Sequence, residues 1–159
     1  LDLNEGIWVL PSNRTKNGQT HTIYLSNLVI EIIRALHLIT GDSTFVFDTG
    51  RYSDGGHIHE DTLTGVIARL RGSVKGIKKK CIKDAPLSEI HSFSIHDLRR
   101  TAATAWGEYL KVEPHVIERM LNHQPLNKLV AVYQRAVYAD EQKTAWLAWG
   151  RLIEEQLAL

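Results

Sequence analysis

The chain has 159 residues, the length of one domain, and is long enough to bury roughly two thirds of its unfolded surface. Its composition, 43% hydrophobic and 23% charged, is ordinary for a globular protein, and no apolar run approaches the ~20 residues of a membrane helix. The single cysteine, Cys81, excludes an internal disulfide, and the net charge of +1 does not by itself indicate a nucleic-acid binder.

The N-terminal segments predict a β-hairpin. Gly6–Leu10 and Thr20–Ser26 have the β-branched and aromatic residues of strands. The polar segment between them, Pro11–Gln19, contains an Asn-Gly turn signal. We therefore expect Lys16 near the tip of a projecting hairpin.

Two helices are predicted next. Ser26 is a plausible N-cap for the first, and Asp61 or Thr62 for the second. Both helices have apolar residues at helical spacing. These are Leu28, Val29, Ile32, Ile33 and Leu36 in the first, and Leu63, Val66, Ile67 and Leu70 in the second.

Basic residues cluster after the second of these helices, with no acidic residue among them. Such a stripe can hold DNA phosphates while the whole chain stays near neutral. A solvated loop with lysines at a helix end explains the pattern equally well. The seven residues are Arg69, Arg71, Lys75, Lys78, Lys79, Lys80 and Lys83.

The remainder is predicted to be helical. Ser94 and Asp97 have the spacing of a capping box, and Glu113-Pro114 starts a further helix that Asn122 ends in a left-handed conformation. A short helix follows from Pro125, and a last amphipathic helix spans about 140–156. The expected fold is mainly α with a small antiparallel β-sheet near the N-terminus.

Four features are candidates for chemistry, and each has an ordinary structural explanation. Lys16 could donate a proton to a departing oxygen, or be a solvated turn residue. His96 and Arg99 lie three residues apart at a helix start, where a phosphate could bind. They could equally be surface residues beside a helix cap. His123 follows a helix stop and could equally be a hydrogen-bonded loop histidine.

The fourth feature is a tyrosine near the end of the chain. Tyr133 lies ten residues after His123, within V-Y-Q-R, and could be a nucleophile or a packed aromatic residue. Tyr138 is its rival, five residues later. No metal site is indicated, because His57 and His59 lack the spacing to cysteine or carboxylate that zinc sites show.

Taken in order, these motifs resemble the catalytic domain of the tyrosine recombinases (phage-integrase family), most closely the prophage and pathogenicity-island integrases. The matching segments are T-K-N-G, S-I-H-D-L-R-R-T-A-A-T, V-I-E-R-M-L-N-H and V-Y-Q-R, and D-L-N-E-G-I-W-V-L-P resembles the strand before the lysine hairpin. The match covers nearly the whole chain, so residues 1–159 are expected to form a single partial catalytic domain.

The sequence departs from the family pattern in two places. Asn122 stands where the family usually has glycine, and asparagine also tolerates the left-handed conformation. No residue among these 159 matches the family's first catalytic arginine, which precedes the lysine hairpin, and we expect the family's DNA-binding domain to lie outside them as well. The resemblance therefore implies that this fragment alone is a poor recombinase.

The resemblance implies site-specific DNA recombination through a 3′-phosphotyrosine intermediate, without metal or cofactor. Tyr133 would be the nucleophile, Lys16 the acid for the leaving 5′-oxygen, and Arg99 and His123 ligands of the phosphate. His96 would accept the tyrosine proton or bind the phosphate, and these two roles stay open.

The implied partners are double-stranded DNA attachment sites and further copies of the protein, as a tetramer on DNA, in a bacterial cytoplasm. The last helix, with Trp146 and Trp149, packs on its own core or on a neighbouring protomer. Two other functions remain open. One is a non-catalytic DNA-binding remnant of an integrase, and the other is a small helical protein-interaction domain.

Overall fold

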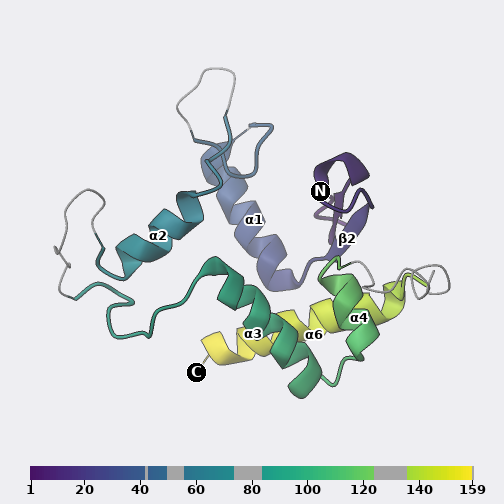
Figure 1. Cartoon of the computed structure of the whole chain (residues 1–159). Coiled ribbons are helices and arrows are strands. Elements are labelled where there is room, and N and C mark those ends of the chain that lie inside the picture. The colour runs from purple at the N-terminus through teal and green to yellow at the C-terminus, as the bar shows by residue number, and fades with distance from the viewer. Residues whose placement is uncertain (42, 50–55, 74–83, 124–135, 159) are drawn as a thin grey trace. The chain divides into compact units, whose positions relative to one another are not determined.

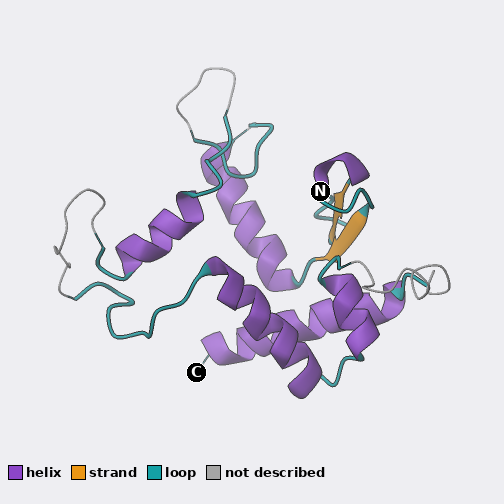
Figure 2. Cartoon of the chain, viewed as in Figure 1, coloured by secondary structure: helices purple, strands orange, loops and turns teal. Residues whose placement is uncertain are grey.

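The computed structural model describes residues 1–41, 43–49, 56–73, 84–123 and 136–158. The described part is mainly helical with one two-stranded antiparallel sheet (Figure 2), as the sequence predicts. In chain order its elements are β1 (Ile7–Leu10), the 3-10 helix η1 (Ser12–Arg14), β2 (His21–Tyr24), α1 (Asn27–Thr40), α2 (Thr62–Leu70), α3 (Ile95–Glu108), α4 (Pro114–Met120) and α6 (Ala139–Leu157), labelled in Figure 1.

The chain forms two compact units. One comprises residues 1–38 and 102–159, and the other residues 39–101. The division crosses α3 between Thr101 and Ala102, so the first turns of that helix belong to the smaller unit. Each unit is described on its own.

The predicted hairpin is confirmed, with strands shorter than expected. β1 and β2 pair in antiparallel register from Ile7 opposite Tyr24 to Leu10 opposite His21. Gly18 has a φ of +68°, a conformation that glycine adopts without steric cost, and it closes the turn predicted from Asn-Gly. The connection also contains η1, which the sequence pattern did not predict.

The core of the larger unit lies where α3, α4 and α6 meet. Trp106 and Met120 are only 2% exposed, and Val116, Leu121 and Ala145 complete the buried cluster. Trp146 and Trp149 pack edge-on against Trp106, with ring centroids 5.0 and 6.4 Å away. The tryptophan face of α6 thus packs on its own core, which is the first of the two arrangements left open above.

The start of α1 is held by α6. Ser26 occupies the N-cap position as predicted, but the Val29 N–H lies a long 3.5 Å from its hydroxyl. A distant carboxylate supplies the closer bond, because the Leu28 N–H donates to Glu154 Oε1 at 3.1 Å. Carboxylates favour helix N-termini, where backbone N–H groups lack partners. Glu154 therefore joins the two ends of this unit's sequence.

The remaining predicted helix boundaries are mostly confirmed. Pro114 is the first residue of α4, and Asn122 has a φ of 53°, the left-handed conformation predicted for it. The prediction of a side-chain cap for α2 is wrong, since neither Asp61 at the N-cap position nor another side chain there bonds to a helix amide. The Asp61 carboxylate lies 3.4 Å from His59 Nδ1 instead.

Several predictions concern residues outside the described ranges. They are the short helix from Pro125, the basic residues from Lys75 to Lys83, Cys81 and the proposed nucleophile Tyr133.

Candidate functional site

The N-terminus of α3 carries the first pair of candidate residues, and a capping box builds it. The Ser94 backbone N–H and hydroxyl donate to Asp97 Oδ2 at 2.9 and 2.8 Å, and the Asp97 N–H lies 3.3 Å from the Ser94 hydroxyl. The hydrogen bonds from Ser94, first from its backbone N–H and then from its hydroxyl, hold the pKa of Asp97 below its ordinary value. Contacts between residues three positions apart, Ser94 and Asp97, therefore fix where α3 begins.

His96 and Arg99 lie in the first turns of this helix, and both are exposed. Their spacing of three places them on one side of the helix, in its first turns, where the positive end of the helix dipole lies. The neighbouring Arg100 pairs with Asp97, with Nη1 3.3 Å from Oδ1. Imidazole, guanidinium and helix end together are a surface suited to an anion such as a phosphate.

The second pair, Lys16 and His123, lies in the larger unit on segments far apart in sequence. The Asn17 side-chain amide donates to the Asn122 carbonyl oxygen at 3.0 Å and lies 2.8 Å from Asn122 Oδ1. The lysine turn of the hairpin is thereby attached to the turn that ends α4. Lys16 lies in the connection of the hairpin, as expected, and this connection also contacts a second segment through Asn17.

His123 follows α4 and is oriented by a residue of that helix, Glu118. Its Nδ1 lies 2.9 Å from Glu118 Oε2, and its backbone N–H donates to the Glu118 carbonyl at 2.9 Å. The side chain remains about half exposed, at 48%. A carboxylate on one ring nitrogen fixes the orientation of the ring.

Lys16 is exposed, and within the described ranges its ammonium has no hydrogen-bond or ion-pair partner. The structure thus joins the segments of Lys16 and His123 in one unit and places His96 and Arg99 together in the other.

The rival tyrosine, Tyr138, is part of the packing. Its ring lies 4.5 Å from that of His115, centroid to centroid, and it contacts the core cluster. Its backbone is left-handed, with a φ of 53°, directly before α6. These contacts give Tyr138 a structural role.

Two contacts that organise the His123 turn were not predicted from the sequence. The contact with Glu118 could have been, because a carboxylate five residues earlier, in the helix that precedes His123, is a local signal. The Asn17–Asn122 contact spans 105 positions and has no local signal.

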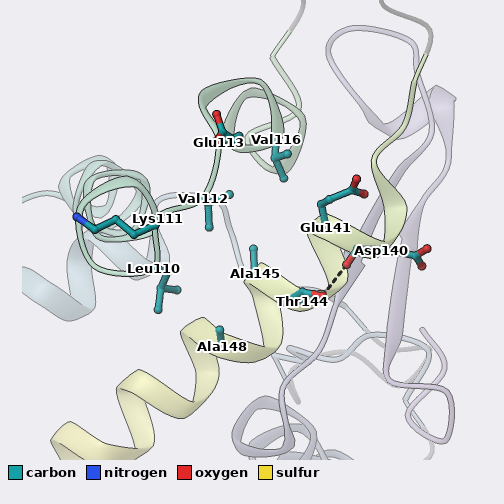
Figure 3. Close-up of a pocket in the computed structure, with 10 residues that line it drawn as sticks. All are labelled: Leu110, Lys111, Val112, Glu113, Val116, Asp140, Glu141, Thr144, Ala145 and Ala148. Atoms are coloured by element: carbon teal, nitrogen blue, oxygen red, sulfur yellow. Dashed lines mark hydrogen bonds between the residues drawn. The ribbon is translucent and has the colours of Figure 1, made fainter.

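A pocket of about 550 Å³ lies between the segment that links α3 to α4, α4 itself and α6 (Figure 3). Val112, Val116 and Ala145 point toward one another across it, and Glu113 and Glu141 lie at its edge. Lys16, His96, Arg99 and His123, the candidate catalytic residues that the structure describes, do not line it. The pocket is therefore separate from the proposed chemistry.

Within the described ranges, no group of three or more histidine, cysteine or acidic side chains is placed to hold a metal ion. No described helix is both long and apolar enough to cross a membrane.

Comparison with known proteins gives one informative similarity. The chain is 24% identical to the prophage integrase IntA of Escherichia coli (strain K12) over 154 residues, and this matched region covers 97% of the chain. The matched region spans about a third of that relative, 33% of its length. No protein-family model and no solved structure matches the chain. The similarity supports a relationship to the integrases.

Proposed function

We propose that this chain is the catalytic part of a tyrosine-type integrase, which recombines DNA by strand cleavage and rejoining. The observation that carries the proposal is the attachment of the Lys16 turn to the His123 turn through Asn17 and Asn122. Two motifs expected to act on one phosphate thereby lie side by side, although 105 residues separate them. The similarity to a prophage integrase, which extends over 97% of this chain, supports the same function.

In the proposed reaction, Tyr133 Oη attacks a DNA phosphorus atom and loses its proton. The new bond joins phosphorus to the tyrosine oxygen, and the bond from phosphorus to the 5′-oxygen breaks. Lys16 protonates that leaving oxygen. The products are a 3′-phosphotyrosine and a free 5′-hydroxyl. Attack by a 5′-hydroxyl of a partner strand reverses the step and needs no ATP.

The other candidate residues act on the phosphate. Arg99 and His123 donate to its non-bridging oxygens, where charge develops in the transition state. His96 accepts the tyrosine proton or binds the same oxygens. We further propose that the family's first catalytic arginine, which has no match among these residues, comes from residues outside this chain.

The test is to trap the covalent adduct. We expect the product of the intact reading frame that contains this chain to form a phosphotyrosine adduct with nicked attachment-site DNA. Tyr133→Phe should abolish the adduct, because phenylalanine has no nucleophilic oxygen. Tyr138→Phe should retain it, since the Tyr138 ring packs against His115. The readout is the shifted band on a denaturing gel.

The opposite pattern, with loss only in Tyr138→Phe, would move the nucleophile to Tyr138. DNA binding without any adduct would favour a non-catalytic DNA-binding remnant over a recombinase.

A further inference from the structure

We propose that Asn17 is a positioning residue: by bonding to Asn122 it holds the Lys16 ammonium at the place where the leaving 5′-oxygen is protonated. This inference rests on the proposed function and adds to it a residue outside the catalytic motifs, together with a reason for the asparagine at position 122.

Both the oxygen and the nitrogen of the Asn17 side-chain amide form hydrogen bonds. Its oxygen accepts the Gln19 backbone N–H at 3.0 Å, within its own turn. Its nitrogen reaches Asn122, 2.8 Å from Oδ1 and 3.0 Å from the carbonyl oxygen. The contact is partly shielded from water, which strengthens it relative to an exposed hydrogen bond. One side chain thus shapes the lysine turn and attaches it to a second segment.

The lysine turn has supports of its own. The Thr15 hydroxyl lies 2.8 Å from the Gln19 carbonyl and 3.1 Å from that of Ser12, and the Gly18 N–H donates to the Thr15 carbonyl at 3.2 Å. Loss of the Asn17 side chain therefore leaves these bonds in place. The interaction that is lost is the hydrogen bonding of the lysine turn to Asn122, at the end of α4.

The turn that Asn17 contacts, formed by Asn122 and His123, is also held by interactions of its own. Asn122 is left-handed, and His123 is fixed to Glu118 through both backbone and ring. Glycine at position 122 would keep this turn and its carbonyl but would lack Oδ1. Asn122 thus contributes an acceptor that the usual residue of the family cannot.

The bond lies one peptide from each proposed catalytic residue. Lys16 precedes Asn17, His123 follows Asn122, and adjacent Cα atoms are about 3.8 Å apart. Lysine is long and flexible, so the position of its backbone limits where the ammonium can reach. A general acid must come within hydrogen-bond distance of the oxygen that it protonates. Fixing the turn beside His123 therefore acts on protonation of the leaving group.

A substrate with sulfur in place of the bridging 5′-oxygen tests this role. A thiolate leaves without a proton, because thiols ionise near pH 8.5, whereas an alkoxide needs an acid. The full-length protein that contains this chain is tested on both substrates in single-turnover reactions. Asn17→Ala and the isosteric Asn17→Asp should slow adduct formation about 10- to 100-fold on the oxygen substrate. On the sulfur substrate both should match the unaltered protein.

Reference variants calibrate the result. Lys16→Ala should show the same rescue by sulfur with a larger defect on oxygen, about 10²- to 10⁴-fold. Arg99→Ala should be slow on both substrates, because charge on the phosphate develops in either case. Asn122→Gly should share the Asn17 pattern more mildly, since the carbonyl acceptor remains. Asn13→Ala removes an exposed asparagine of η1, in the same connection, and should change neither rate.

Equal slowing of Asn17→Ala and Asn17→Asp on both substrates would overturn the inference, because it signals general damage. Rates of adduct formation that are unchanged in both Asn17 variants on both substrates would also overturn the inference. An unaltered protein that forms no adduct with either substrate would instead overturn the proposed function on which the inference rests.

Discussion

Gly150 marks the closest approach between α6 and the segment that starts α1. A Cβ atom built on Gly150 would overlap the side chain of Ser26, which is itself buried. At Gly107 in α3, the nearest atom to such a Cβ is Ile117 Cδ1 at 3.6 Å, an ordinary van der Waals contact. The two helical glycines therefore differ in what surrounds them.

This difference predicts opposite effects of one substitution. Gly150→Ala should lower the free energy of unfolding by about 1–3 kcal/mol, because overpacking outweighs the gain in helix propensity. Gly107→Ala should be neutral or raise it by up to about 1 kcal/mol. Urea denaturation of both variants measures the difference. Equal stability of the two would show that the segments at Ser26 and Gly150 are not in close contact.

At the scale of elements, the start of α3 depends on ionised Asp97. Hydrogen bonds from the backbone N–H and hydroxyl of Ser94 lower the pKa of this carboxyl group. A pKa lowered by folding contributes stability that is present above the unfolded value and is lost as pH falls through the folded value. The first turn of α3, with His96 and Arg99, is thus expected to fray in acid.

Ser94→Ala tests this dependence. It removes the hydroxyl donor and should raise the pKa of Asp97 toward its ordinary value, while the backbone donor remains. A carboxyl-carbon NMR titration of both proteins reports the change. Ser88→Ala, an exposed serine nearby, serves as the matched control and should leave the titration of Asp97 unchanged. An unshifted Asp97 titration in Ser94→Ala would contradict the capping role of the hydroxyl.

At the scale of the whole molecule, the distribution of charge bears on DNA binding. The net charge is +1, yet Arg69–Lys83 contains seven basic residues and no acidic one. If this stretch binds phosphates, DNA affinity should fall steeply with salt, because each contact releases counterions. The alternative of a protein-interaction domain predicts no such dependence.

A charge-removal variant makes the prediction specific. Replacing Lys78, Lys79 and Lys80 with glutamine should reduce the slope of log affinity against log salt by up to about three, measured by fluorescence titration. Replacing the exposed Lys143 and Arg151 of α6 with glutamine is the control and should leave the slope nearly unchanged. If the slope is unchanged in the lysine variant as well as in the α6 control, the stretch does not contact DNA phosphates.

Apart from the 3-10 helix η1, the sequence by itself determined the helices and strands of the described residues and most of their ends. The Ser94–Asp97 capping box, Pro114 at the first turn of α4 and left-handed Asn122 follow from neighbours within a few residues, where backbone geometry decides. Asp61 shows the limit of this reasoning, because its backbone is helical (φ −75°, ψ −6°) rather than extended, and its side chain does not reach the helix amides.

Only the tertiary structure decided what these elements touch. Asn17 with Asn122, Leu28 with Glu154 and Ser26 with Gly150 are pairs more than a hundred residues apart. Their partners depend on how packed helices bring distant backbone together, which local propensity does not encode. The motifs could therefore name Lys16 and His123 as a pair, but the hydrogen bond that joins their turns arises from packing.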